Sequence, residues 1–392
     1  MIGVEEARQR LVEAAPAAQG VQQPLLDADG RYLTGDVIAP YDDPLFDRSA
    51  VDGYAFRFAD IDQALRINGA IAAGEVYRGG SLEGCCVRIF TGAPVPPEAD
   101  TVVMQEFCGL QDERVTINDP KLQRGGNIRR QGEQVRAGDV LLKKGTRITP
   151  AAVGLLASVG VREVEVGRSP AVAIVRTGNE FVEHGAIRPG LIFSSNDDLL
   201  VSGLRQAGLL DTSLHKANDS VGDITEAVEN ALQEAEVVIT TGGVSVGDHD
   251  LVPEVLKRLG ARILFHGVAQ KPGKPMLLAE VQGRYVFGLP GNPRAVFVLF
   301  HTYVLPFLRM LQGATDPWPR KDTLPIEQPL RVKGDRAEFR AARVHEGRIE
   351  LLADEGSHML RTLVVADALA YIPPTVRELR AGDPVELLYL PR

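Results

Sequence analysis

Cysteine is scarce in this chain of 392 residues, and the patterns of several common cofactor sites are missing. The three cysteines, Cys85, Cys86 and Cys108, form an odd-numbered set that favours a reducing compartment over a disulfide framework. No cysteine and histidine spacing suits zinc, and the seven histidines form no cluster in the sequence. A glycine-rich dinucleotide fingerprint and a P-loop are also absent, which argues against the enzyme classes that depend on them.

Surplus positive charge and long apolar segments are lacking as well. The formal net charge is −9, which argues against general binding to nucleic acid or to an anionic membrane. The first residues lack the basic start and apolar centre of a secretory signal. The longest near-apolar stretch that we identify, residues 151–161, is too short to cross a bilayer. The sequence therefore predicts a cytoplasmic, soluble protein without a nucleic-acid or membrane partner.

Glycine and proline, by contrast, are plentiful, with 40 and 25 residues, and they predict many tight turns. Between residues 56 and 130 they separate short apolar runs, which is typical of a β-rich domain. From residue 170 to 316, apolar runs alternate with helical patterns, which predicts a doubly wound α/β domain. After residue 317, short strands divided by proline, glycine and aspartate suggest a small β-barrel or sandwich.

The most informative stretch is the glycine-rich loop Thr240–Asp250, which lies between a predicted buried strand and a predicted helix. In open α/β sheets, ligands bind at the carboxyl ends of the strands. Glycines there let backbone N–H groups approach a ligand closely. Taken alone, such a loop fits either an oxyanion or phosphate site or a structural turn. Loops 177–180 and 289–293 also follow strands, so we expect all three at one edge of the sheet, with 271–275 nearby.

The polar residues of these loops suggest anion binding together with acid or metal chemistry. Carboxylates such as Glu180, Asp248 and Asp250 could bind Mg²⁺ or orient a water molecule. Lys271 and Lys274 lie on a loop stiffened by proline, which lowers the entropy cost of holding them on an anion. Each lysine considered singly could equally be a solvated surface side chain. The loop before residue 293 also opens a helix, whose positive N-terminal end attracts anions.

Further candidates lie in the β-rich part of the chain. Asp52 precedes a glycine in a turn, which a simple Asx turn would also explain. Thr91 follows a predicted strand and begins a rigid loop that contains two prolines. Arg129 and Arg130 could hold a phosphate by paired hydrogen bonds, or they could form a solvated charge pair. The local pattern alone does not join these residues to the glycine-rich loop.

A set of motifs in a fixed order resembles a known family. The motifs are Phe46–Ala55 (FDRSAVDGYA), Thr91–Pro96 (TGAPVP), Asn127–Glu133 (NIRRQGE), Thr241–Gly247 (TGGVSVG), Lys271–Pro275 (KPGKP) and Gly288–Pro293 (GLPGNP). Between residues 25 and 312 the chain is similar to the molybdopterin molybdenumtransferases, the MoeA family, and to the E domain of gephyrin. After residue 320 the resemblance is weaker.

The resemblance implies a multidomain α/β plus β fold, a reaction and an assembly. The implied domains are an elongated discontinuous domain at 1–45 and 133–169, a β-rich domain at 46–132, a molybdopterin-binding-like, doubly wound α/β domain at 170–316 and a C-terminal β-barrel at 317–392. In the implied reaction, molybdate and adenylated molybdopterin give molybdenum–molybdopterin and AMP, with Mg²⁺ as cofactor. The implied assembly is a homodimer whose clefts combine the α/β domain of one subunit with the β-rich domain of the other. Other proteins of molybdenum cofactor biosynthesis are further expected partners.

The resemblance also assigns roles to single positions. It implies catalytic roles for Asp52, Thr91, Glu180 and Asp250, and the last two are the expected metal ligands. Together with the loop chemistry it predicts the substrate-binding residues Gly242, Gly243, Ser245, Gly247, Asp248, Lys271, Lys274, Pro290, Gly291, Asn292, Pro293 and Arg129. The chain departs from the family pattern at Gln134 and His266, where an acidic residue and a lysine are usual. Arg340 and Gly356–His358 match only loosely, so the resemblance assigns them no role.

Two other functions stay open. A gephyrin-like scaffold would anchor a peptide in the same cleft and would not need the carboxylates, so the presence of Asp52 and Asp250 disfavours it. A molybdopterin adenylyltransferase would share the glycine-rich loop, but the surrounding domains and the motif around Asp52 favour insertion. Both molybdate and tungstate are compatible with the resemblance.

Overall fold

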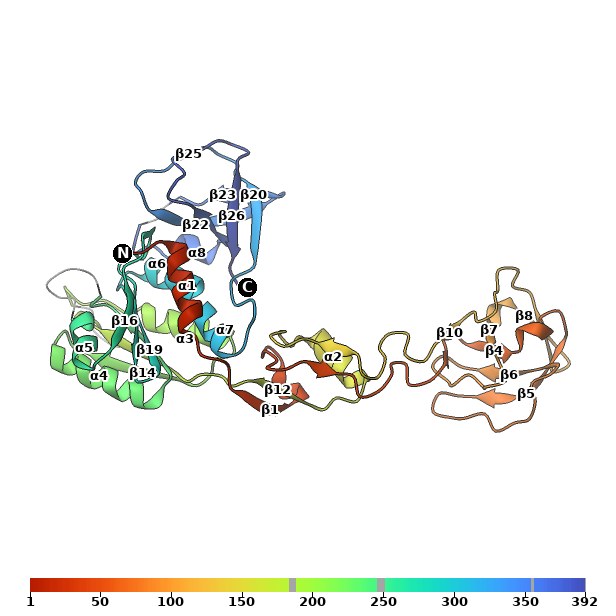
Figure 1. Ribbon diagram of the computed structural model, residues 1–392. Helices are drawn as coiled ribbons and strands as arrows, with labels where there is room; N and C mark the ends of the chain where they lie inside the picture. The colour runs from red at the N-terminus through yellow and green to blue at the C-terminus, as the bar shows by residue number, and fades with distance from the viewer. Residues whose placement is uncertain (183–187, 245–250, 354–355, 392) are drawn as a thin grey trace.

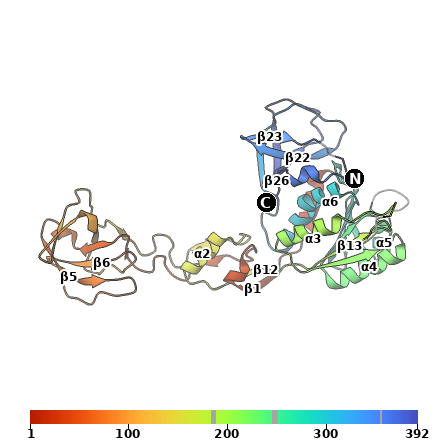
Figure 2. The same ribbon diagram turned by 180° about the vertical axis from the view of Figure 1, so that it is seen from behind.

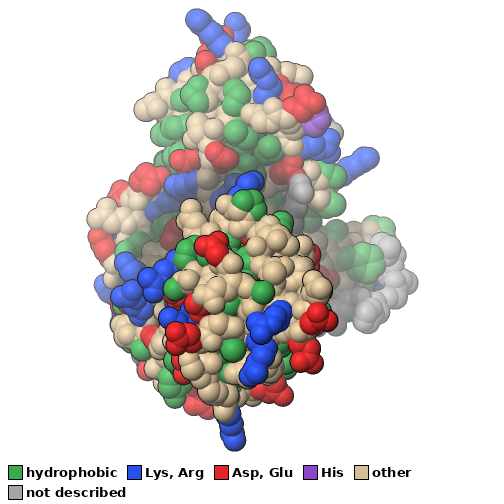
Figure 3. Space-filling model, turned by 90° about the vertical axis from the view of Figure 1, so that its right-hand side faces the viewer, with side chains coloured by type: hydrophobic (Ala, Val, Ile, Leu, Met, Phe, Trp, Pro, Cys, Tyr) green, Lys and Arg blue, Asp and Glu red, His purple; other side chains and the backbone are tan. Residues whose placement is uncertain are grey.

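The computed structural model describes residues 1–182, 188–244, 251–353 and 356–391. The chain is elongated: a β-rich body lies at one end, a slender middle part follows, and a larger body holds the α/β sheet and the C-terminal strands (Figure 1). Figure 2 shows the same separation from behind. In Figure 3, which faces the β-rich end, acidic and basic side chains are interspersed over the surface.

The β-rich end is built on a six-stranded sheet with the order β7-β4-β6-β5-β9-β8. Its strands are β4 (Gly53–Phe56), β5 (Leu65–Ile71), β6 (Cys85–Ile89), β7 (Thr101–Met104), β8 (Cys108–Gln111) and β9 (Arg114–Ile117). Two separate apolar clusters, one containing Val87 and the other Cys86, show that neighbouring residues of β6 face opposite sides of the sheet. All three cysteines are free, and burial raises the pKa of the Cys86 thiol to about 12. The prediction of short strands in this part of the chain is confirmed.

The chain passes through the middle part twice. Strand β1 (Gly20–Pro24), from the outgoing pass, pairs antiparallel with β12 (Glu163–Gly167) from the return. In the same way β2 (Val37–Ile38) pairs with β11 (Val140–Leu142). Where the chain enters and leaves the β-rich body, β3 (Arg48–Ser49) pairs with β10 (Ile128–Arg129). Helix α2 (Pro150–Ser158) begins after Thr149, because the Thr149 hydroxyl accepts the N–H of Ala152 at 3.3 Å and Pro150 fits the first turn.

The α/β sheet has six strands in the order β14-β13-β15-β19-β18-β16. They are β13 (Val172–Thr177), β14 (Thr212–Ala217), β15 (Val237–Thr241), β16 (Arg262–His266), β18 (Leu277–Val281) and β19 (Arg284–Leu289). Strands β14, β13, β15 and β19 are parallel, whereas β18 runs antiparallel to both of its neighbours. The parallel strands therefore end at one edge, as the apolar runs predicted.

Helices cover both faces of this sheet. One apolar cluster joins it to α1 (Val4–Ala14), α3 (Asn196–Gln206), α6 (Pro293–Leu299) and α7 (Leu305–Leu311), and a second joins it to α4 (Val221–Glu234) and α5 (Val252–Arg258). A π-helical turn, Phe300–Val304, connects α6 to α7, so that residues 293–311 form one long helix. The prediction of a doubly wound arrangement agrees with this two-sided covering.

The helix 293–311 is the one described helix that is long and apolar enough to cross a membrane. Its apolar window is 78% buried inside the protein, which is typical of a core helix. The stretch 151–161 is therefore not the longest near-apolar segment. The polar Arg294, His301 and Arg309 interrupt this apolar run.

The N-terminal helix α1 lies against the α/β body and not in the middle part. Its buried residues Val4, Ala7 and Leu11 belong to the cluster that contains the long helix. The Tyr285 hydroxyl donates to the carbonyl of Ala14 at 2.6 Å and thereby holds the end of α1 against the sheet.

The C-terminal strands form a mixed sheet with the order β17-β22-β24-β26-β20, and β23 pairs with the free part of β22. The strands are β20 (Lys321–Pro325), β22 (Ala337–His345), β23 (Arg348–Leu351), β24 (Ala368–Ile372) and β26 (Pro384–Tyr389), with β21 (Leu330–Arg331) paired to β25 (Glu378–Leu379). Strand β17 (Gln270–Lys271) comes from the α/β segment and runs parallel to β22. Closure of these strands into a barrel goes beyond this pairing and stays a prediction.

Candidate functional site

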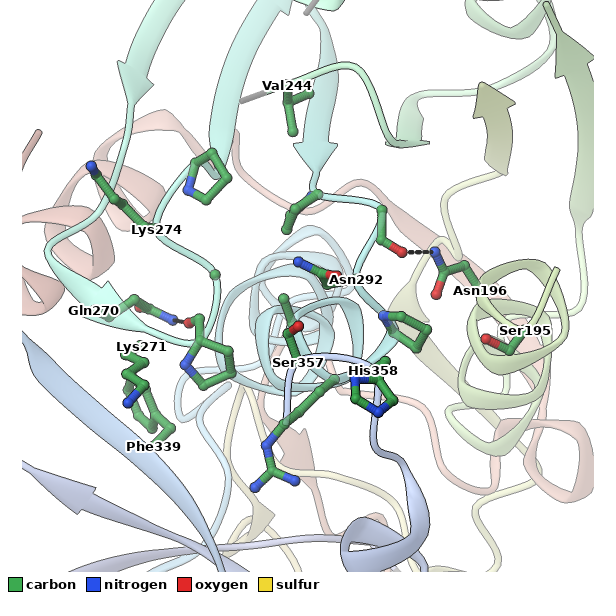
Figure 4. Close-up of a pocket in the computed structure, with 18 of the residues that line it drawn as sticks. Ser195, Asn196, Val244, Gln270, Lys271, Lys274, Asn292, Phe339, Ser357 and His358 are labelled. Atoms are coloured by element: carbon green, nitrogen blue, oxygen red, sulfur yellow. Dashed lines mark hydrogen bonds between the residues drawn. The ribbon is translucent and has the colours of Figure 1, made fainter. Parts of the chain in front are cut away.

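A cavity of about 800 Å³ lies at the carboxyl edge of the α/β sheet, where the C-terminal strands approach it. The loops after β13, β15 and β19 contribute to its wall, as expected, and so does the segment that contains β17. The residues that line it include Glu180, Gly243, Val244, Lys271, Pro272, Gly273, Lys274, Pro275, Pro290, Gly291, Asn292 and Pro293. Figure 4 shows how the side chains of several elements surround this space.

The glycine-rich loop turns sharply where β15 ends. Gly242 has φ +95° and Gly243 has φ +62°, a region that favours glycine. A Cβ on Gly242 would lie 2.7 Å from the Thr177 hydroxyl oxygen, so this backbone can pack against β13 only without a side chain. The Gly242 N–H donates to the carbonyl of Leu289 at 2.9 Å, which ties the loop to the end of β19.

Part of this loop falls outside the described residues. The predicted site residues there are Ser245, Gly247, Asp248 and Asp250. At the last described position before them, the Val244 carbonyl lies 3.0 Å from His266 Nε2. His266, one of the two positions at which the chain departs from the family pattern, thus contacts the backbone of the glycine-rich loop.

The loop 290–293 is held from the side by helix α3. The amide of Asn196 donates to the carbonyl of Gly291 at 2.8 Å, and Figure 4 shows this contact. Asn292 precedes the long helix, and its carbonyl accepts the N–H groups of Ala295 and Val296 at 3.0 and 3.1 Å. The N-terminal end of the helix therefore faces the cavity, where its dipole favours negative charge.

The lysine loop is anchored by buried contacts. Gln270 is fully buried, accepts a hydrogen bond from the Tyr303 hydroxyl and donates to the Pro272 carbonyl at 2.8 Å. Gly273 has φ +93°, and a Cβ on it would lie 2.7 Å from the Leu299 side chain of the long helix. The lysines on either side of Pro272 and Gly273 are consequently presented from a rigid backbone.

Strand β22 places further charged groups beside Lys271. The register pairs Lys271 with Glu338, and their side chains lie 4.0 Å apart between Nζ and Oε1. Arg340 Nε donates to Glu338 Oε2 at 2.8 Å. The Glu338 side chain is only 5% exposed, whereas Lys271 is 60% exposed, so the carboxylate is buried behind the cations.

Positive charge dominates the described part of the cavity wall. The cationic side chains are Lys271, Lys274, Arg294, Arg336 and Arg340, and the carboxylates are Glu180 and Glu338. Such a wall suits an anionic ligand such as a phosphate or another oxyanion. Among the described residues, no group of three histidine, cysteine, aspartate or glutamate side chains could hold a metal ion. Glu180 alone does not make a Mg²⁺ site.

The predicted residues of the β-rich body form a site of their own. The Asp52 carboxylate accepts the backbone N–H of Thr91 at 2.8 Å and its hydroxyl at 2.7 Å. These two hydrogen bonds, the backbone one first, lower the pKa of Asp52 below its ordinary value. Arg129 is exposed on β10. Figure 1 shows this body far from the α/β sheet, so one chain does not bring Asp52, Thr91 or Arg129 to the cavity.

Several lining residues were not predicted. They are Phe181, Ile192, Phe193, Ser195, Asn196, Arg336, Phe339, Ser357 and His358, together with Glu338 and the loosely matching Arg340. The pairing of β17 with β22 brings the C-terminal residues to the cavity. That pairing joins distant parts of the chain and leaves no spacing in the sequence that could reveal it.

Comparison with known proteins places this geometry in a family. Residues 2–160 match the MoeA N-terminal region (domain I and II), residues 173–310 a probable molybdopterin binding domain, and residues 323–390 the MoeA C-terminal region (domain IV). The molybdopterin molybdenumtransferases of Staphylococcus epidermidis and Staphylococcus aureus are each 33% identical, over 405 and 406 residues, with coverage of 99% of this chain and 95% of the relative.

A solved structure supports the same grouping. The molybdopterin biosynthesis moeA protein of Pyrococcus horikoshii OT3 matches with a TM-score of 0.85 and 29% identity, over 100% of both chains. Fold, domain content and near full-length similarity therefore agree. The chain belongs to the MoeA family of molybdopterin molybdenumtransferases, which act in molybdenum cofactor biosynthesis.

Proposed function

We propose that this chain transfers molybdenum from molybdate to adenylated molybdopterin and releases AMP. The observation that carries the proposal is the cationic cavity at the carboxyl edge of the α/β sheet. Both substrates are anions, and the wall offers positive side chains, close-approach glycines and a helix N-terminus. Two phosphate-like groups need to be held side by side for the reaction, and a wide cavity fits that requirement.

The wall suggests a division of roles. Gly242 and Gly243 bring backbone close to the loop 290–293, where the phosphate part of the adenylate would lie against the start of the long helix. Lys271, Lys274 and Arg340 would hold molybdate on the side of the cavity formed by β17 and the C-terminal part, where Ser357 and His358 also line the wall. Bringing both anions to one rigid wall supplies proximity and orientation for the transfer.

Mg²⁺ stays part of the proposal through Asp250 and Glu180. When bound, the ion would offset negative charge at the phosphoanhydride. Glu180 lines the cavity. Asp250 belongs to the glycine-rich loop, whose described residues Gly243 and Val244 also line it. A pairing of these two carboxylates would suit the oxygen ligands that Mg²⁺ prefers.

We further propose that the working unit is a homodimer. Asp52 lies in the β-rich body, far from the cavity of its own chain. In a dimer, the α/β part of a second copy could bring its cavity to this residue. Large apolar side chains are exposed along the middle part and its junction with the β-rich body, at Leu26, Ile38, Tyr41, Leu45, Phe46 and Val140. Several exposed apolar side chains on one part of a molecule are a feature of protein interfaces. A cytoplasmic location and contacts with other cofactor-assembly proteins belong to the same proposal.

Reconstitution with purified protein tests the reaction. One mixture contains preformed adenylated molybdopterin and molybdate, and the other contains molybdopterin, ATP and molybdate. Insertion is expected only in the first, with AMP released in step with the molybdenum cofactor. Formation of the adenylate in the second mixture would instead indicate an adenylyltransferase, and no turnover in either would favour a scaffold.

A further inference from the structure

The first turn of the long helix carries a buried arginine beside the cavity. Arg294 follows Pro293 directly and is 2% exposed, which makes it one of the largest fully buried side chains of the protein. Removing a guanidinium from water is costly unless it is hydrogen-bonded. The groups that it contacts therefore indicate why an arginine lies at this position.

Three hydrogen bonds join Arg294 to one segment of the C-terminal part. Its Nη1 donates to the Thr362 hydroxyl at 2.8 Å and to the Met359 carbonyl at 3.4 Å. Its backbone N–H donates to the carbonyl of Ser357 at 3.3 Å. One residue of the α/β part thus holds the segment 356–362, which leads into α8 (Arg361–Val364), through both main chain and side chain.

This segment forms part of the cavity wall. Ser357 and His358 both line the cavity (Figure 4), and the hydrogen bond from the Arg294 N–H places Ser357 at the start of the helix. A Cβ on Gly356 would approach the side chains of His358 and Met359 to 3.2 and 3.4 Å, so the segment is tightly folded. Because it is short, a shift at its Arg294 contacts would move the Ser357 hydroxyl and the His358 ring.

We propose that Arg294 is a positioning residue that fixes Ser357 and His358 at the anion-binding side of the cavity. The inference rests on the proposed function, since it takes molybdate as the ligand of that side. Packing alone does not require an arginine here, because an apolar side chain with apolar neighbours would fill the same space without burying a charge. A fixed polar wall for an oxyanion explains it, because misplaced groups bind and react poorly.

The test is Arg294→Met in the full-length protein. Methionine retains much of the apolar stem but none of the donors, so the fold should persist with a lower melting temperature, because the Thr362 hydroxyl and the Met359 carbonyl lose their partner. The KM for molybdate should rise about tenfold, whereas kcat at saturating molybdate should stay within about twofold, as expected for lost ground-state binding. Amide hydrogen exchange across residues 356–364 should become faster.

Arg309→Met is the matched control. Arg309 lies on the same helix, is partly buried and donates to the Pro317 carbonyl at 3.1 Å, away from the cavity. It should leave the KM for molybdate and the exchange of 356–364 unchanged. An ammonium keeps the positive charge and can replace some of the guanidinium donors, so Arg294→Lys should recover part of the molybdate affinity.

Either of two results would overturn the inference: an unchanged KM for molybdate in Arg294→Met, or equal losses of kcat and stability without a change in KM. A wild-type protein that inserts no molybdenum would contradict the proposed function instead. In that event, calorimetric titration with molybdate and the exchange of 356–364 still decide the inference. Faster exchange with weaker molybdate binding would support it, and unchanged values would refute it.

Discussion

Glu338 is a buried carboxylate in a cavity whose wall is otherwise mainly cationic. It accepts a hydrogen bond from Arg340 and lies 4.0 Å from the ammonium of Lys271. A negative charge at this place opposes the binding of an anion but also holds the two cations in one array. The first effect is electrostatic and the second is geometric, so an isosteric change can separate them.

Glu338→Gln should tighten the binding of molybdate, and of competing sulfate, on the order of tenfold. Glutamine keeps an acceptor for Arg340 and removes the opposing charge. Calorimetric titration of the purified variant measures the change. Glu350→Gln is the control, because Glu350 pairs with Arg343 at 4.0 Å on the exposed part of the same sheet. Weaker molybdate binding in Glu338→Gln would show that orientation outweighs repulsion.

Asp52 has a depressed pKa, which determines its pH dependence. The hydrogen bonds from Thr91 stabilise the carboxylate and lower its pKa in the folded protein. Any contribution of Asp52 to the stability of the fold is therefore fully present above the ordinary pKa of aspartate. It is lost as pH falls through the lower pKa of the folded state. Between about pH 5 and 8 the carboxylate therefore keeps its charge. A pH–rate profile in that range should not report the titration of Asp52.

Asp52→Asn should lower the insertion rate at least about 100-fold, if the carboxylate takes part in proton transfer or holds a cationic group. Asparagine still accepts hydrogen bonds from Thr91, so the local loop should survive. Steady-state insertion kinetics and thermal melting are the measurements. Activity close to that of the wild type in the folded variant would contradict the catalytic role.

At the scale of elements, the carboxyl edge of the sheet depends on helices that come from distant parts of the sequence. The long helix supplies its N-terminus to the cavity and packs its remaining length on the sheet. Helix α1 packs in the same cluster, although almost 160 residues separate it from the first strand of that sheet, β13. The N-terminal helix thus stabilises the part of the molecule that carries the cavity.

Leu11→Ala should reduce the free energy of unfolding of this body by about 2–5 kcal/mol, the range for a fully buried leucine. Val12→Ala on the same helix is the control, since Val12 is 54% exposed and its truncation should change stability by no more than about 0.5 kcal/mol. Denaturant unfolding followed by circular dichroism compares the two. Equal effects would mean that α1 does not pack as described.

At the scale of the whole molecule, the elongated shape separates two groups of predicted site residues. Asp52 and Thr91 lie in the β-rich body, and the lysine loop, the loop 290–293 and the C-terminal strands surround the cavity (Figure 1). The proposed dimer would bring the groups together in trans. Two inactive variants could then complement each other in a mixed dimer, which a site formed within one chain does not allow.

Mixing Asp52→Ala subunits with Asp250→Ala subunits should restore activity that neither variant has alone. After random exchange, half of the dimers are mixed and each has one intact cleft, so about a quarter of wild-type activity is expected. Each variant alone should be folded and inactive. Refolding or co-expression of the two tagged subunits, followed by insertion assays, provides the measurement. No recovery in purified mixed dimers would show that both residues act within one subunit.

The sequence by itself determined the elements and much of the cavity. Apolar runs predicted the strands of the α/β sheet, and glycine and proline loops predicted three of its edge loops, because backbone conformation and periodic burial are local properties. The lysine loop was expected nearby, and it does line the same cavity. The motifs between residues 46 and 293 follow the same order as in the family to which the chain belongs, so the sequence also indicated the family.

Tertiary structure alone decided which distant side chains complete the wall. Glu338, Arg340, Ser357 and His358 reach the cavity through the pairing of β17 with β22 and through the contacts of Arg294. Each of these contacts depends on packing between segments far apart in the sequence, which no local pattern encodes. The distance between Asp52 and the cavity likewise follows from the slender middle part, where the chain passes twice and holds the two ends apart.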